Sequence, residues 1–127
     1  MIKTVNTDSA PAAIGPYTQA KIVGDLIFTS GQIPIDPTTG NSEAKTIEEQ
    51  TEQICKNLSA VLTAAGSSLK LVIKTTCYLS DMADFSAFND VYARYFTEKP
   101  ARSCVAVKAL PKGALAEIEA IARVSEK

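Results

Sequence analysis

The sequence predicts an α+β domain in which two helices cover one face of a mixed six-stranded sheet. The expected elements follow the order β-β-β-α-β-α-β-β, and helices placed between strands require crossover connections. The 127 residues suit a single domain, 1–127. Nothing in the pattern is left to cover the second sheet face. Because Leu71–Leu79 carries apolar or small residues on both faces apart from Lys74, we expect the sheets of several copies to pack together.

The first three strands are short and are bounded by turn residues. They are expected over Ile2–Val5, Tyr17–Val23 and Leu26–Ser30. Gly24-Asp25 joins the last two as a hairpin. Ala10–Gly15 before the hairpin and Gly31–Gly40 after it contain Pro and Gly, which predicts irregular segments.

The clearest helix runs from Thr46 to Ala65. Thr46 and Glu49 match a capping box, and Gly66 is a typical stop signal. An apolar stripe follows its helical period through Ile47, Ile54, Leu58, Val61, Leu62 and Ala65. Such a stripe can bind a partner, but a stripe that faces the core is the commoner case.

A second helix is expected from Asp84 to Thr97, with its aromatic side chains mostly inward. Aromatic residues at helical spacing belong to a core more often than to a ligand site. They are Phe85, Phe88, Tyr92, Tyr95 and Phe96. The remaining strands are expected over Leu69–Leu79, Arg102–Val107 and Glu117–Val124.

Composition excludes several classes of function. The net charge of −1, from 13 basic and 14 acidic residues, argues against a general nucleic-acid binder. The chain has no His, so His-based catalysis is excluded, and no ligand spacing predicts a metal or cofactor. Without an apolar leader or membrane segment, we expect a cytoplasmic protein whose three cysteines are free thiols.

Two strands carry the best candidates for chemistry. Arg102 and Cys104 point to one face of their strand, and a guanidinium can bind a carboxylate through two parallel hydrogen bonds. Glu117 and Glu119 share a face of the last strand, and paired carboxylates suit acid–base work. Solvated strand ends produce both patterns as well. Burial and Glu119 would raise the pKa of Glu117, Arg102 would lower it, and the sequence leaves the balance open.

Three weaker candidates lie near turns. Tyr17 follows the rigid Gly15-Pro16, and Ser30 and Gly31 end a strand where backbone amides can approach a ligand. Cys104 has no neighbour in the sequence that would activate its thiol, so we expect it to contribute its backbone groups instead.

Four segments together resemble the RidA-type (YjgF) family of reactive intermediate deaminases, in order along the whole chain. They are Ala10–Tyr17, Phe28–Pro34, Pro100–Val105 and Leu110–Lys112 with Glu117–Ala122. The resemblance implies a chorismate-mutase-like fold and a homotrimer with three clefts between subunits. It also implies hydrolysis of 2-iminobutanoate and 2-iminopropanoate to 2-oxo acids and ammonia.

The resemblance implies a role for each matching residue. Arg102 would bind the substrate carboxylate, and Glu117 would position or activate water. Gly31 and Cys104 would contribute backbone contacts, while Tyr17, Ser30 and Asn89 would line the cleft. One departure is the short Thr97–Lys99 segment before Pro100, where a longer loop is expected in close bacterial relatives.

Strand direction leads to a hypothesis about the site. If the last two strands are antiparallel, Arg102 and Glu117 begin at opposite ends, about 15–20 Å apart within one chain. A small acid cannot bridge that distance, so each cleft would pair Arg102 of one subunit with Glu117 of another. Two alternatives stay open: a non-catalytic module that binds 2-oxo acids or related metabolites, and an endoribonuclease or translation inhibitor.

Overall fold

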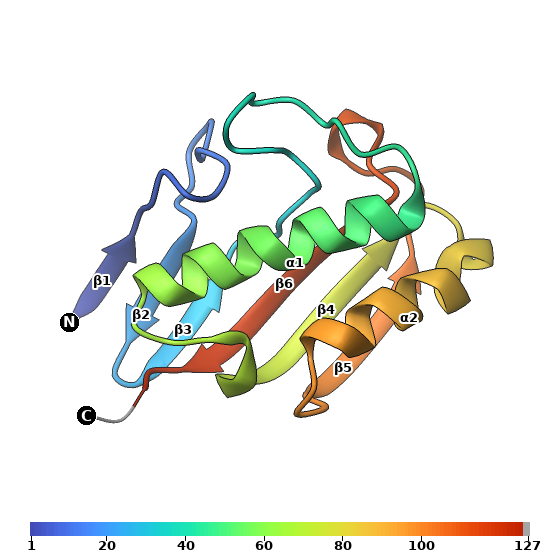
Figure 1. Cartoon of the computed structure of the whole chain (residues 1–127). Helices are drawn as coiled ribbons and strands as arrows, with labels where there is room; N and C mark the ends of the chain where they lie inside the picture. The colour runs from blue at the N-terminus through green and yellow to red at the C-terminus, as the bar shows by residue number, and fades with distance from the viewer. Residues whose placement is uncertain (126–127) are drawn as a thin grey trace.

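Hydrogen bonds join six strands in the order β1-β2-β3-β6-β4-β5 in the computed structural model, which describes residues 1–125 (Figure 1). The strands are β1 Ile2–Val5, β2 Ala20–Val23, β3 Leu26–Thr29, β4 Val72–Leu79, β5 Ala101–Ala106 and β6 Ala116–Arg123. The sheet is mixed because β4 and β5 are parallel, whereas the other neighbours are antiparallel. The predicted fold class is confirmed; residues 126 and 127 of the predicted domain lie outside the described residues.

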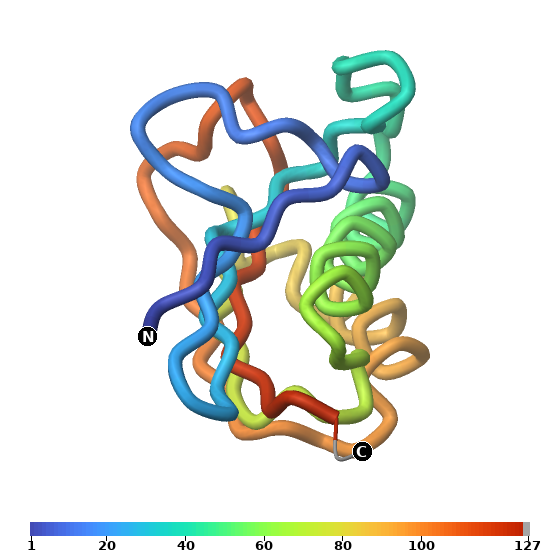
Figure 2. Tube along the Cα trace, turned by 90° about the vertical axis from the view of Figure 1, so that its left-hand side faces the viewer, coloured from blue at the N-terminus to red at the C-terminus, as the bar shows by residue number. Residues whose placement is uncertain are grey.

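Two helices lie on the same face of the sheet. Figure 2 shows α1, Ile47–Ala64, and α2, Phe85–Tyr95, together on one side, and no helix of the described residues covers the other side. We call the uncovered side the helix-free face. None of the helices within residues 1–125 has the length and apolar character needed to cross a membrane.

The ends of α1 confirm the signals in the sequence. The Glu49 N–H donates to Thr46 Oγ1 at 3.1 Å, and the Thr46 N–H donates to Glu49 Oε1 at 3.2 Å, which completes the capping box. After the helix, Gly66 has a φ of 82°, and the Ser67 N–H donates to the Leu62 carbonyl at 2.8 Å. These bonds satisfy backbone groups that a helix end leaves without partners.

Two strands begin three residues later than predicted, and β3 ends one residue earlier, at Thr29. The Tyr17 N–H donates to the Gly15 carbonyl at 2.9 Å, a tight turn that removes Tyr17 from the ladder, and β2 begins only at Ala20. Before β4, Leu69–Leu71 forms a short 3₁₀ turn in which the Leu71 N–H donates to the Ser68 carbonyl. Local hydrogen bonds therefore override the strand preference at both places.

The core lies between the sheet and the helices. Along β6, residues 116, 118, 120 and 122 are buried against the helices, while the residues between them face the other side. Three of these four buried residues are alanine, so α1 can approach the sheet closely. On the helix-free face, the side chains of Val23, Phe28 and Val105 stay exposed. Packing of that face against another copy stays a prediction.

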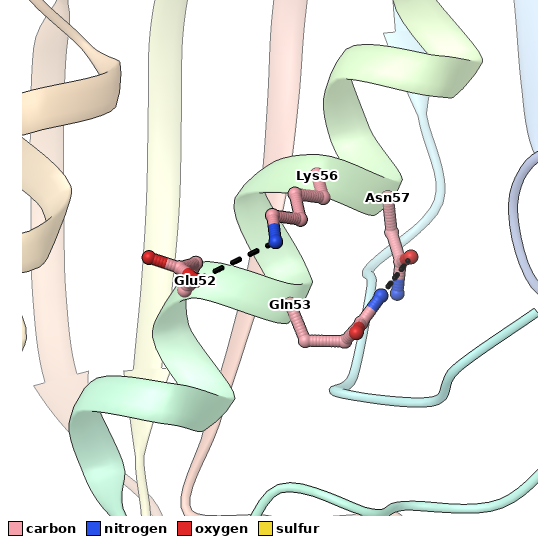
Figure 3. A network of polar contacts seen from close by, with 4 residues as sticks. All are labelled: Glu52, Gln53, Lys56 and Asn57. Carbon is pink, nitrogen blue, oxygen red and sulfur yellow. Dashed lines mark hydrogen bonds and ion pairs between the residues drawn. The ribbon is translucent and has the colours of Figure 1, made fainter.

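A buried amide fastens the loop after β3 to α1. Asn57 Nδ2 donates to the carbonyls of Ile33 and Ile35 at 3.3 and 2.9 Å. Its Oδ1 accepts from Gln53 Nε2 at 2.9 Å, beside the more exposed Glu52–Lys56 ion pair (Figure 3). Since this loop begins directly after β3, Asn57 helps to hold the backbone near residue 31 in place.

Candidate functional site

Arg102 is held against α2 and is not simply solvated at a sheet end. Its side chain projects from β5 to the helix-covered face, where Nη1 donates to Asn89 Oδ1 at 2.7 Å. The guanidinium carbon lies 4.8 Å from the ring centroid of Tyr92 and 5.6 Å from that of Phe85. These contacts use one N–H donor and leave the others for a ligand.

Cys104 offers its backbone at an open sheet edge. Among the strands of residues 1–125, β5 pairs only with β4, and the Val107 N–H donates to the Leu79 carbonyl across that pairing. Because backbone groups alternate in direction along a strand, the N–H and C=O of Cys104 point away from β4. The same alternation sends the backbone groups of Arg102 outward, so the edge can hydrogen-bond a ligand or a second chain.

The carboxylate of Glu117 occupies space directly beside Gly31. A Cβ atom added to Gly31 would lie 2.0 Å from Glu117 Oε2 and 2.9 Å from its Cδ. Two backbone hydrogen bonds between Gln32 and Ile118, of 2.8 and 3.1 Å, fix the two segments together. The φ of Gly31 lies outside the left-handed region, so this glycine is needed for space rather than for its backbone conformation.

The balance of effects on Glu117 favours a raised pKa. Burial is the larger cause, and the negative charge of Glu119 adds to it. Glu119 is itself fixed by Tyr78, whose hydroxyl donates to Glu119 Oε1 at 2.9 Å. Arg102 does not lower the pKa of Glu117 within the chain, so the question that the sequence left open is answered for a single copy.

Arg102 and Glu117 lie on opposite faces of the sheet. Their strands run antiparallel, the condition of the shared-cleft hypothesis, but β4 separates them, with Arg102 beside Thr75 and Glu117 beside Tyr78. Three residues along β4 and two strand spacings across it place their backbones about 14 Å apart. The intervening sheet keeps the side chains apart, so one small acid cannot touch both within a single chain.

Tyr17 and Ser30 lie toward the helix-free face, the face that also carries Glu117, and away from Arg102. Both line a cavity of about 470 Å³ that also includes Lys21 and Phe28, residues of the helix-free face. Ser30 Oγ donates to the Thr18 carbonyl, which ties the end of β3 to the segment before β2. The seven predicted site residues therefore form two groups. Tyr17, Ser30, Gly31 and Glu117 make up one, and Asn89, Arg102 and Cys104 the other.

A second cavity, of about 310 Å³, opens beside Arg102. Tyr92, Phe96 and Pro100 form apolar parts of its wall, and Lys99 adds a second cation. Lys99 has a φ of 52°, within the tight turn that the short Thr97–Lys99 segment makes. The shortened segment thus borders a space next to the guanidinium.

The cysteines lack the features of reactive thiolates. All three are free, and Cys55 and Cys77 are buried. Burial raises the pKa of the Cys104 thiol, and nearby Arg102 only partly offsets this. Within residues 1–125, no three His, Cys, Asp or Glu side chains gather where they could hold a metal ion.

A family model described as Endoribonuclease L-PSP matches residues 7–124. The chain belongs to the YjgF/RidA family. The RutC family protein PH0854 of Pyrococcus horikoshii is 54% identical over 96% of this chain and 98% of its own. The 2-iminobutanoate/2-iminopropanoate deaminase of Salmonella typhimurium is 47% identical over 96% and 98%.

Solved structures of YjgF/RidA relatives share the whole fold. The crystal structure of E. coli TdcF with bound serine has a TM-score of 0.92, with 44% identity and coverage of 97% of this chain and 99% of that one. Family members thus carry several names, among them imine deaminase and endoribonuclease.

The sequence does not reveal the residues that support the two groups of site residues, one around Glu117 and one around Arg102. Tyr92 and Thr75, which contact each other beside Arg102, read only as core and strand residues. Nothing in the sequence connects Tyr78 with Glu119 directly. Strict strand alternation is the available signal, since it places Tyr78 on the face opposite Cys77 and Leu79.

Proposed function

We propose that this protein hydrolyses 2-imino acids, such as 2-iminobutanoate and 2-iminopropanoate, to 2-oxo acids and ammonia. The observation that carries the proposal is a guanidinium that Asn89 fixes beside a cavity, with donors left for a substrate carboxylate. Arg102 binds the substrate carboxylate, and Glu117 positions or activates water. The name of the Salmonella relative supports this choice of substrates.

The reaction needs few catalytic groups because an imine carbon is already electrophilic. Arg102 orients the carboxylate, and orientation of this kind can remove up to about 7–11 kcal/mol of barrier. Water attacks the imine carbon, and as the C–O bond forms the second C–N bond breaks, while Glu117 takes a proton from the water and passes it to nitrogen. Glu117 then carries the remaining hydroxyl proton to nitrogen, the C–N single bond breaks, and ammonia leaves as the 2-oxo group forms. A carboxylate base of this kind contributes about 10²–10⁴-fold.

The site is completed by a second copy of the chain. Arg102 and Glu117 lie on opposite faces of one sheet. Each cleft therefore combines Arg102, Cys104 and Asn89 of one copy with the four residues Tyr17, Ser30, Gly31 and Glu117 of the next copy. The open edge of β5 provides the outward backbone groups of Cys104. We place three such clefts between the subunits of a homotrimer, an arrangement that accounts for the uncovered sheet face.

Subunit mixing tests both the reaction and the shared cleft. Threonine dehydratase generates 2-iminobutanoate in situ, and its rate of disappearance is followed with Arg102→Ala, Glu117→Ala and mixtures of the two. Each variant alone should be inactive. In a random 1:1 mixture about a quarter of the clefts pair an intact Arg102 with an intact Glu117, so activity should return to that fraction. No recovery, with exchange of tagged wild-type subunits verified, would contradict the shared cleft.

Two other activities are separated by the same variants. The name of the family model makes RNA cleavage the second candidate, although the net charge is −1 and His is lacking. RNA cleavage that persists in Arg102→Ala and Glu117→Ala protein would come from another site or a contaminant. A purely metabolite-binding role predicts carboxylate binding without any imine hydrolysis by the wild type.

A further inference from the structure

The rings of Phe88, Tyr92 and Phe96 form a row along α2 and its C-terminal end, and this aromatic row reaches the candidate site. Tyr92 stacks on Phe96 with a centroid distance of 4.4 Å and an interplanar angle of 23°, and its ring also lies 5.8 Å from that of Phe88 and 4.8 Å from the Arg102 guanidinium carbon. Its hydroxyl lies 2.7 Å from Thr75 Oγ1. Tyr92 is 7% exposed and Thr75 is fully buried. The row therefore connects the core with a cation that the proposed reaction uses.

We propose that Tyr92 is a positioning residue for Arg102, with Thr75 holding the ring in place. The inference rests on the proposed function, because it deepens the role of the same carboxylate site. The ring covers one face of the guanidinium, and Asn89 accepts from one N–H. The donors that remain lie along the edge of the guanidinium and can grip a carboxylate in parallel. A guanidinium fixed before binding loses less rotational freedom when the substrate arrives.

The hydroxyl of Tyr92 distinguishes this role from plain core packing. A Phe would fill the same space in the core, as Phe88 and Phe96 do one turn away on either side. A buried hydroxyl instead requires a partner, and that partner lies on β4 at the level of Arg102 on β5. The bond thus fastens the ring to the part of the sheet from which the guanidinium projects.

The experiment compares carboxylate binding with stability in four variants. Tyr92→Leu removes the ring face, Tyr92→Phe keeps it, and Thr75→Val removes only the partner of the hydroxyl. Phe88→Leu is the matched control, because Phe88 is a fully buried aromatic residue on α2 whose ring lies 5.8 Å from that of Tyr92. The measurements are the dissociation constant of 2-oxobutanoate by calorimetry, the melting temperature, and kcat and KM with in situ 2-iminobutanoate.

Loss of the ring should weaken binding more than it weakens folding. We expect Tyr92→Leu to raise the dissociation constant and KM by about 2- to 30-fold, the range of cation–π contacts. Tyr92→Phe keeps the ring face and leaves no buried hydroxyl to satisfy, so it should stay within about twofold of the wild type. Thr75→Val leaves the Tyr92 hydroxyl buried without its partner and lets the ring shift, so it should weaken binding more than Tyr92→Phe does. Phe88→Leu should lower the melting temperature and leave binding unchanged. If Tyr92→Leu fails to fold, Tyr92→Met replaces it, since the unbranched Met side chain adapts to an irregular space.

Several outcomes would overturn the inference. They are unchanged binding in Tyr92→Leu, equal loss of binding in Phe88→Leu, failure of Tyr92→Phe to preserve binding, and absence of 2-oxobutanoate binding by the wild type. A wild type that binds 2-oxobutanoate but hydrolyses no imine would refute the proposed reaction alone. In that case the calorimetric comparison still decides the role of Tyr92.

Discussion

Replacing Gly31 by Ala should abolish the proposed activity without unfolding the protein. The new methyl group would lie 2.0 Å from Glu117 Oε2 and 2.9 Å from its Cδ, distances that non-bonded atoms do not tolerate. The backbone itself accepts Ala, because the φ of Gly31 lies outside the left-handed region. Glu117 must therefore rotate away from its position.

The magnitude follows from which atoms have to move. Overpacking costs about 1–3 kcal/mol when the surroundings are rigid. Here the closest atom is the end of a flexible side chain beside open space, so the free energy of unfolding should change by no more than the lower part of that range. The rate should fall almost as far as in Glu117→Ala, by about 10²–10⁴-fold, if the carboxylate acts as the base.

A double-mutant cycle separates two roles of Gly31. The assay follows hydrolysis of 2-iminobutanoate and, separately, binding of 2-oxobutanoate by wild type, Gly31→Ala, Glu117→Ala and the double variant. If Gly31 only makes room for Glu117, adding Gly31→Ala to Glu117→Ala should change neither quantity. If its backbone also approaches the ligand, the double variant should bind more weakly than Glu117→Ala. An active Gly31→Ala protein would refute the steric argument altogether.

Four further predictions concern stability and pH. Asn57→Leu leaves the buried carbonyls of Ile33 and Ile35 unpaired, so it should lower the free energy of unfolding by about 1–3 kcal/mol for each carbonyl. Urea denaturation measures this, and unchanged stability would contradict it. Thr46→Ala removes the helix cap and should cost about 0.5–2 kcal/mol by the same measurement, whereas Glu48→Gln, exposed in the same turn, should cost less. Glu119→Gln removes a charge that raises the pKa of Glu117, so the acid limb of kcat/KM against pH should move to lower pH; movement to higher pH would contradict this cause. Folding raises the pKa of Glu117, so the folded state loses stability as pH rises through that pKa and the carboxyl group ionises. Glu117→Gln carries no such charge, so it should melt at a higher temperature than wild type at neutral pH but not in acid.

Local signals in the sequence predict most of the fold. The capping box at Thr46 and the stop at Gly66 depend on residues within one helical turn, so spacing alone reveals them. The alternation of β6 likewise suffices to place Glu117 and Glu119 on one face. Errors at strand ends, as at Tyr17, arise where a turn hydrogen bond competes with the ladder.

The arrangement of the site could not be predicted in full because it depends on strand order. Antiparallel strands for Arg102 and Glu117 are the condition on which the shared-cleft hypothesis rests, and the structure meets it. Spacing alone does not establish this condition. It contains no signal that β4 lies between them, nor that their side chains leave the sheet on opposite faces. Both facts follow from pairings between segments far apart in the sequence, and no local pattern records such pairings.

The separation of the two residues also has an electrostatic consequence. In one copy, burial and Glu119 raise the pKa of Glu117 and no cation opposes them. In the proposed cleft, Arg102 of the neighbouring copy approaches Glu117 and offsets part of that rise in its pKa. A bound substrate carboxylate partly neutralises the guanidinium, so the pKa of Glu117 rises again when the substrate is in place. Glu117 is therefore a stronger base when substrate is bound in the cleft than when the cleft is empty. Assembly of the subunits without substrate does not produce this increase.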